Sequence, residues 1–294
     1  MTYRPRRSVL YMPGANTRAL EKAKTLSADC IILDLEDAVA PEMKHQAREH
    51  VKNAVEEKGY GAREVIVRIN GLDTPWGRDD MAMVAQAQPN AVLVPKVNTK
   101  DDVLSAAQSL NISQASNVTK LWVMMETPLA ILNAKEIALC AQDPESRLTC
   151  FVMGTNDLAK DTAAHLTDDR LPLISWLSTC VAAAKAYNIS IIDGVYNDLN
   201  NEAAFHQQCR QGLQLGMDGK TLIHPKQLEV CNEVFAPDAE EVAWAQKILD
   251  AFAMPENQNK GALSLEGRMV ERLHAEMAAK TIAIAKAIQE NISS

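Results

Sequence analysis

The chain has 294 residues, of which 47% are hydrophobic and 23% are charged, and this composition excludes a disordered or fibrous protein. Its formal net charge of −8 argues against partners that are nucleic acids or membrane surfaces. No stretch reaches the roughly 18 apolar residues that a transmembrane helix needs, and the apolar run after the basic N-terminus is too short for a signal peptide. We therefore expect a cytoplasmic protein that holds any anionic substrate with individual arginines and lysines.

The six cysteines form no CxxC pair and show no disulfide-framework spacing. Most of them lie inside apolar or helical runs, which predicts buried free thiols in a reducing compartment. They are Cys30, Cys140, Cys150, Cys180, Cys209 and Cys231.

Short apolar runs alternate with helical patterns along most of the chain, and near-continuous apolar strands between helices indicate a parallel sheet covered on both faces. Eight such units over roughly 235 residues match a (β/α)8 TIM barrel. A doubly wound open sheet is the alternative, but no GxGxxG motif follows the first strand. The expected strands are 8–11, 30–35, 65–69, 91–94, 121–125, 148–153, 189–192 and 219–223. The expected helices are 17–26, 42–58, 78–86, 100–110, 173–187, 202–215 and 227–234, with a further helical run between the fifth and sixth strands.

The alternation ends near residue 236, so we predict a barrel at 1–236 and a C-terminal helical extension at 237–294. Helices are expected near 239–253 and 270–290, after a polar linker at 255–261. Because this tail is too small to bury its own core, it should pack on the barrel or on a neighbouring subunit.

Polar residues stand at the C-terminal end of almost every expected strand. In a barrel these ends converge on one mouth, where the catalytic residues of such folds lie. Since a barrel does not need this much charge in order to fold, we predict a catalytic mouth. The residues are Asp34, Glu36, Asp37, Arg68, Lys96, Glu126, Asp157, Asp193 and His224.

Two of these acids, Glu126 and Asp157, follow the fifth and sixth strands. Neighbouring parallel strands lie about 4.8 Å apart, so both carboxylates could share one divalent cation. An all-oxygen pair that leaves room for water and substrate suits Mg²⁺. The alternative is that Glu126 caps the next helix and Asp157 stabilises a turn.

Several segments, read in order, resemble the citrate lyase β-subunit-like family of CoA-ester lyases. They are RRSVLYMPG, IILDLEDAV, VIVRIN, VLVPKV, METP, GTNDLAKD, DGVYNDLN, DGKTLIHPKQ and EGRM. The resemblance implies a (β/α)8 barrel that assembles into homotrimers or hexamers and holds Mg²⁺ in its mouth. The implied reaction cleaves a 3-hydroxyacyl-CoA reversibly to a short acyl-CoA and an α-keto acid.

By this resemblance Glu126 and Asp157 are the metal ligands and Arg68 binds the substrate carboxylate. The family's acid or base near the C-terminus, an Asp donated into the adjacent subunit, corresponds here to Glu266. The extra methylene of Glu266 either preserves proton transfer with a small shift or spoils its geometry. This departure leaves the rate and the reaction type open.

Glu36 and Asp37 are predicted to bind substrate together with Arg68, Glu126 and Lys96, or to hold Arg68 and Lys96 in place. A helix-capping role for Asp37 is the alternative. Lys96 could form a Schiff base with a keto acid, but a salt bridge in an acidic mouth is favoured.

Three arginines near the N-terminus, Arg6, Arg7 and Arg18, are candidates for contacts with CoA phosphates, with surface solvation as the alternative. His224 precedes a proline at a strand end, where a histidine is often only a hydrogen-bonding structural residue.

The leading hypothesis is a Mg²⁺-dependent carbon–carbon lyase acting on malyl-CoA, methylmalyl-CoA or citramalyl-CoA. The first alternative is a malyl-CoA thioesterase that uses the same site. The others are a β subunit of a multiprotein citrate lyase that acts on an acyl-carrier thioester, and a barrel without catalysis. The expected partners are a CoA thioester, a small α-keto acid and further copies of the chain.

Overall fold

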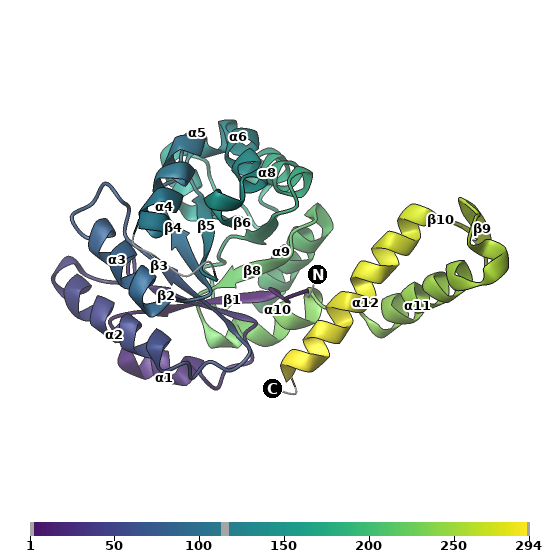
Figure 1. Ribbon diagram of the computed structural model, residues 1–294. Helices are drawn as coiled ribbons and strands as arrows, with labels where there is room; N and C mark the ends of the chain where they lie inside the picture. The colour runs from purple at the N-terminus through teal and green to yellow at the C-terminus, as the bar shows by residue number, and fades with distance from the viewer. Residues whose placement is uncertain (1–2, 113–117, 293–294) are drawn as a thin grey trace. The chain divides into compact units, whose positions relative to one another are not determined.

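The structure, a computed structural model, describes residues 3–112 and 118–292 (Figure 1). The chain divides into two compact units. The barrel unit comprises Arg6–Asn232, and the C-terminal unit comprises Glu233–Ser294 with Met1–Pro5.

Eight parallel strands form a closed barrel in the order in which they occur along the chain (Figure 1). They are β1 (Ser8–Pro13), β2 (Cys30–Asp34), β3 (Glu64–Arg68), β4 (Ala91–Val94), β5 (Lys120–Met125), β6 (Leu148–Met153), β7 (Ser190–Asp193) and β8 (Gly219–Leu222). The pairing of β1 with β8 closes the barrel and excludes an open sheet, so the predicted barrel is confirmed.

Helices follow the strands and surround the barrel in Figure 1. They are α1 (Thr17–Ala23), α2 (Lys44–Glu56), α3 (Gly77–Ala87), α4 (Lys100–Ile112), α5 (Pro128–Leu132), α6 (Ala134–Leu139), α7 (Thr155–Thr162), α8 (Ile174–Ala186), α9 (Glu202–Leu215) and α10 (Leu228–Val234). Short 3₁₀ helices lie at Pro41–Met43, Cys140–Gln142, Pro144–Ser146, Leu171–Leu173, Pro225–Gln227 and Pro255–Asn257. The helical run expected after the fifth strand is split between α5 and α6.

The interior of the barrel explains where the polar mouth lies. One buried cluster is made by alternate residues of the strands, among them Ile32, Ile66 and Met124. Side chains two residues apart on a strand point to the same face. The residue two positions after Ile66 is Arg68, and the one two positions after Met124 is Glu126. The apolar core therefore continues directly into polar side chains at the C-terminal end of the barrel.

The C-terminal unit consists mainly of α11 (Ala239–Ala253) and α12 (Arg272–Ile292) with an antiparallel hairpin between them. The hairpin strands, β9 (Ala262–Leu265) and β10 (Arg268–Glu271), were not expected from the sequence. Glu266 and Gly267 connect them, both with positive φ, of 50° and 79°. Two consecutive positive φ angles are typical of the tight type I′ hairpin turn.

Two further expectations concern the whole described chain. All six cysteines are free and buried, as predicted. Within residues 3–112 and 118–292, no helix is both long and apolar enough to cross a membrane.

Candidate functional site

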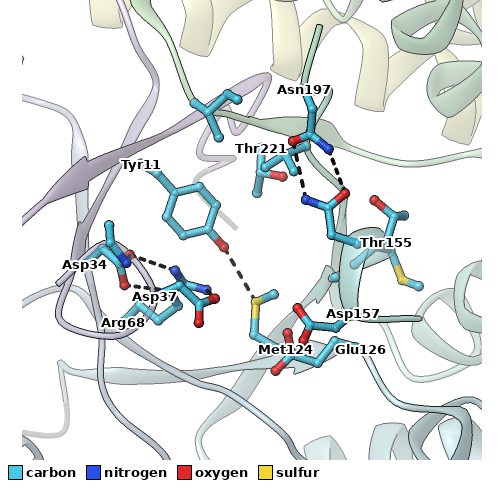
Figure 2. A pocket seen from close by; sticks show the side chains of 16 residues that line it. Tyr11, Asp34, Asp37, Arg68, Met124, Glu126, Thr155, Asp157, Asn197 and Thr221 are labelled. Atoms are coloured by element: carbon cyan, nitrogen blue, oxygen red, sulfur yellow. Dashed lines mark hydrogen bonds and ion pairs between the residues drawn. The ribbon is translucent and has the colours of Figure 1, made fainter. Parts of the chain in front are cut away.

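A cavity of about 310 Å³ opens at the C-terminal ends of the barrel strands. Figure 2 shows Glu126 and Asp157 close together on one wall, with Arg68, Asp34 and Asp37 grouped on another. The full lining is Tyr11, Asp34, Asp37, Ala38, Arg68, Met124, Glu126, Met153, Gly154, Thr155, Asn156, Asp157, Val195, Asn197, Thr221 and Ile223.

Strand register brings Glu126 and Asp157 to the same wall. Strands β5 and β6 are paired, with Met125 opposite Met153, so the segments that leave them start side by side. Glu126 follows β5 directly, and Asp157 lies in the first turn of α7, where the helix dipole favours a carboxylate. Glu126 does not cap the next helix, because Thr127 caps α5 with its hydroxyl.

Glu126 is 1% exposed, and burial raises the pKa of its carboxyl, while the neighbouring Lys96 opposes the shift. The Lys96 backbone N–H donates to Glu126 Oε1 at 2.7 Å, and Lys96 Nζ forms an ion pair with Asp157. Nζ also lies 3.7 Å from Glu126 Oε1. The two acids therefore already share a cationic group, which is the charge arrangement that a bound cation requires.

This donor set fits Mg²⁺. The described residues contain no group of three or more His, Cys, Asp and Glu side chains placed to hold a metal. Mg²⁺ is commonly bound by one or two carboxylates, with waters and substrate oxygens as its other ligands. Two adjoining carboxylates at the edge of an open cavity match this pattern.

Gly154 leaves the space in which Glu126 sits. A Cβ added to Gly154 would lie 2.3 Å from Glu126 Cβ and 2.8 Å from Oε2. Any larger residue at this position must therefore displace the carboxylate.

We predict that Gly154→Ala lowers Mg²⁺ affinity by about tenfold or more, because Glu126 must move. Isothermal titration calorimetry with MgCl₂ measures the effect. Gly261→Ala is the control, because a Cβ there meets no atom within 4 Å. Unchanged affinity in Gly154→Ala would show that Glu126 contributes nothing to cation binding.

Arg68 ends β3 and is buried, at 7% exposure. Its Nε and Nη2 donate to the two carboxylate oxygens of Asp34 at 2.6 and 2.7 Å. The guanidinium also lies over the Tyr11 ring, 4.8 Å from its centroid. These contacts fix the plane of the guanidinium. Nη1 is the guanidinium nitrogen that is not bonded to Asp34.

Glu36 and Asp37 lie beside Nη1 of Arg68. Asp37 accepts a hydrogen bond from Nη1 at 3.2 Å, and its side chain is 68% exposed. Glu36 Oε2 lies 2.9 Å from Nη1 but makes no hydrogen bond with a described residue. Burial raises the pKa of Glu36 to about 8; Arg68 opposes the shift, and the nearby acids, Asp37 first, add to it. The Glu36 carboxyl therefore holds its proton to a higher pH than an exposed glutamate does.

Several neutral side chains of the cavity are not among the residues predicted from the sequence. Asn156 and Asn197 bond to each other through both amides, with N···O distances of 3.3 and 2.8 Å. Thr155 and Thr221 also line the cavity, and Figure 2 shows Thr221 beside Asn197. Asn156 and Asn197 occur in the segments GTNDL and GVYND, which follow strands β6 and β7. This position after a strand is the sequence feature from which both could have been predicted to line the mouth.

Asp193 was expected in the mouth but does not line this cavity. It is fully buried, and both of its carboxylate oxygens accept bonds from Arg170 Nη1, at 2.7 and 2.8 Å. Lys220, also fully buried, donates to Asp193 at 3.0 Å and to the Gly194 carbonyl at 2.5 Å. These two cations lower the pKa of Asp193 against the effect of burial. The cluster joins β7 to β8.

We predict that Asp193→Asn lowers the free energy of unfolding by about 3 kcal/mol or more, because it leaves two buried cations without their counter-ion. Urea denaturation measures the loss. Asp198→Asn, at an exposed position in the following loop, is the control and is expected to change stability little. Equal stabilities for the two variants would contradict the role given to Asp193.

Other residues have structural roles. His224 does not line the cavity, and its Nδ1 accepts from the Lys226 backbone N–H as a helix cap. Arg6 and Arg7 form ion pairs with Glu64 and Asp29 at the N-terminal end of the strands. The prediction that these two arginines bind CoA phosphates is therefore wrong, because their guanidinium groups are bound to buried carboxylates at the end opposite the mouth.

Glu266 belongs to the C-terminal unit. Its carboxylate accepts from Lys247 Nζ at 2.7 Å, and its side chain is 56% exposed. A hairpin tip with an exposed acid is accessible to a substrate or to another chain.

Comparisons with known proteins show which family the chain resembles. Residues 7–225 match the model of the HpcH/HpaI aldolase/citrate lyase family. The chain is 46% identical to a (3S)-malyl-CoA thioesterase of Cereibacter sphaeroides, over 97% of this chain and 96% of the relative. It is 34% identical to the citrate lyase subunit beta of Escherichia coli, over 91% and 89%. The crystal structure of CitE from Mycobacterium tuberculosis, in complex with magnesium, acetoacetate and coenzyme A, matches with a TM-score of 0.74 at 25% identity, over 97% and 100%.

Proposed function

Since the chain belongs to the HpcH/HpaI aldolase/citrate lyase family, we propose that it is a Mg²⁺-dependent enzyme that hydrolyses the thioester of (3S)-malyl-CoA or a closely similar 3-hydroxyacyl-CoA. The observation that carries the choice of reaction is the 46% identity to a (3S)-malyl-CoA thioesterase, which extends over nearly the full length of both chains. The carbon–carbon lyase favoured by the sequence motifs becomes the second candidate.

The cavity has the groups that such a substrate needs. Glu126 and Asp157 are the proposed ligands of the cation, and Arg68 Nη1 is the proposed donor to the substrate's carboxylate. Magnesium held there supplies a Lewis acid and an orienting template for substrate oxygens. Because Asp34 fixes the Arg68 guanidinium, a substrate carboxylate meets a positioned donor, Nη1, and replaces the Glu36 and Asp37 side chains that lie beside it.

In hydrolysis a water oxygen forms a bond to the thioester carbon, the carbon–sulfur bond breaks, and the CoA sulfur receives a proton. Glu266 is the proposed acid–base group, by correspondence with the family's Asp. We also propose a homotrimer or hexamer in which Glu266 serves a neighbouring subunit. We propose that Lys96 forms ion pairs with Glu126 and Asp157. Hydrolysis needs no Schiff base at Lys96, because it requires no electron sink at a keto carbon.

The lyase remains the second candidate because the chain is also 34% identical to a citrate lyase subunit beta. Product analysis distinguishes the two reactions. The purified chain is incubated with (3S)-malyl-CoA and Mg²⁺, and the products are separated by chromatography. Free CoA with malate supports the thioesterase, and acetyl-CoA with glyoxylate supports the lyase. Turnover only after an acyl-carrier protein is added would indicate a citrate lyase subunit.

We predict that Glu266→Gln slows turnover by about a hundredfold, the order of a lost acid–base group, and leaves Mg²⁺ affinity unchanged. Mixing Glu266→Gln protein with Glu126→Gln protein before reassembly tests whether subunits share sites. Recovery of activity in the mixture supports a shared site. Loss of Mg²⁺ binding in Glu266→Gln alone would overturn the role given to Glu266.

The raised pKa of Glu36 predicts a pH dependence of substrate binding. As the pH rises through about 8, Glu36 loses its proton and competes with the substrate carboxylate for Arg68. We therefore expect KM to rise above pH 8 in the wild type and to stay flatter in Glu36→Gln. Because Glu36 ionises near pH 4.5 in the unfolded chain and only near 8 in the folded chain, its contribution to stability is lost as the pH rises from about 4.5 to 8. Identical KM profiles for the two proteins would contradict this assignment.

A further inference from the structure

Lys96 makes two separate contacts with the acid pair. One residue, Pro95, separates Lys96 from the end of β4. The backbone φ of Lys96 is 54°, in the left-handed region that residues other than glycine rarely adopt. This conformation accompanies the bond from its N–H to Glu126 Oε1 at 2.7 Å. Its side chain then pairs with Asp157 and approaches Glu126. Lys96 thus contacts the acid pair in two ways: its backbone N–H bonds to Glu126, and its ammonium pairs with Asp157 and approaches Glu126.

The two contacts differ in how easily they break. Glu126 is 1% exposed, and the backbone donor cannot leave without a change of the loop. The Lys96 side chain is 43% exposed and also lines a neighbouring cavity of about 400 Å³, which contains Asp73 and Asp102. An adjoining cavity with two further acids in its lining therefore gives the Lys96 side chain an alternative to its place beside Asp157.

We propose that Lys96 is a displaceable counter-ion of the Glu126–Asp157 pair, which neutralises the acids in the metal-free protein and must withdraw from them when Mg²⁺ binds. This inference rests on the metal site of the proposed function. The Lys96 N–H remains on Glu126 and keeps that carboxylate in place, while the ammonium competes with the metal. Lys96 thereby weakens Mg²⁺ binding. In the metal-free protein it neutralises the repulsion between the carboxylates of Glu126 and Asp157.

Mg²⁺ titration calorimetry on the full chain tests the proposal. Lys96→Gly and Lys96→Asn remove the ammonium but keep the backbone N–H and tolerate a positive φ. We expect both to bind Mg²⁺ at least about threefold more tightly than the wild type, the order of a partly exposed ion pair. The increase in Tm on adding saturating Mg²⁺ should grow in parallel. Lys160→Met, at an exposed position of α7 one turn beyond Asp157, removes the same charge nearby and controls for general electrostatics.

Affinity that is unchanged or weaker in both Lys96 variants would overturn the proposal, as would an equal gain in Lys160→Met. Circular dichroism verifies that each variant is folded. If the wild type and both variants all fail to bind Mg²⁺, the metal site fails and this inference fails with it. If the wild type binds Mg²⁺ and the variants bind it no better, only the role of Lys96 is wrong.

Discussion

Glu126→Gln is expected to lower turnover of (3S)-malyl-CoA by about a thousandfold or more and to abolish measurable Mg²⁺ binding. The amide keeps the volume of the buried side chain but removes one of the two charges that hold the cation. The loss of the cation removes electrostatic stabilisation, commonly the largest contribution to catalysis. Steady-state kinetics at several Mg²⁺ concentrations, together with calorimetry, measures both effects.

The Glu126→Gln protein is expected to remain folded, because the amide oxygen of the substituted side chain can still accept the hydrogen bond that the Lys96 N–H donates to Glu126. Asp157→Asn should behave in the same way. Asp161→Asn, four residues further along α7 at an exposed position, is the matched control and should keep wild-type activity. Near-normal Mg²⁺-dependent rates in Glu126→Gln would contradict the assignment of Glu126 as a ligand.

Arg68→Lys is expected to raise KM by about thirtyfold or more, although the charge is retained. Arg68 bonds to Asp34 through Nε and Nη2 while presenting Nη1 to the cavity, and a single ammonium cannot do both. Lysine at this position also leaves buried Asp34 with poorer hydrogen bonding, so we expect a loss of about 2 kcal/mol in the free energy of unfolding.

Kinetics with (3S)-malyl-CoA and urea denaturation measure these two effects separately. Arg78→Lys, at an exposed position in α3, is the control. If Arg68→Lys loses stability but keeps its KM, Arg68 holds Asp34 and does not touch the substrate. If both quantities are unchanged, neither role is correct.

The barrel could be predicted because its strands are continuous apolar runs that end in polar residues, such as 148–153, which is observed as β6 (Leu148–Met153). The meeting of Glu126 and Asp157 followed from the pairing of consecutive parallel strands. The first inference depends on the pattern of apolar and polar residues, and the second depends on the order of the strands along the chain. Both can be read from a sequence.

Other features depend on contacts between distant residues. Asp193 is an acid at a strand end, as Glu126 is, but both of its carboxylate oxygens are bound by Arg170, from a loop 23 positions earlier, and by Lys220. Nothing in the local sequence of Asp193 distinguishes a buried counter-ion from a residue of the mouth. Similarly, Lys96 was expected to form a salt bridge, but its left-handed backbone and its second contact with Glu126 required the fold.

The hairpin β9–β10 was missed for a different reason. Its strands have four residues each, and half of their side chains are exposed, so their apolar pattern is weak. The signal that could have identified it is the pair Glu266-Gly267, a polar residue followed by glycine between two short segments that contain apolar residues. Glutamate at a positive φ is uncommon, which made this pair harder to recognise than Asp-Gly.

A crystal of the protein soaked in MnCl₂ and measured near the manganese absorption edge tests the cation site most directly. Mn²⁺ accepts the same oxygen ligands as Mg²⁺ and gives an anomalous signal. We expect one peak in the barrel mouth within bonding distance of Glu126 and Asp157, with the Lys96 ammonium moved away from Asp157. A peak held by other residues, or an intact Lys96–Asp157 ion pair with no metal beside it, would contradict the proposed metal site.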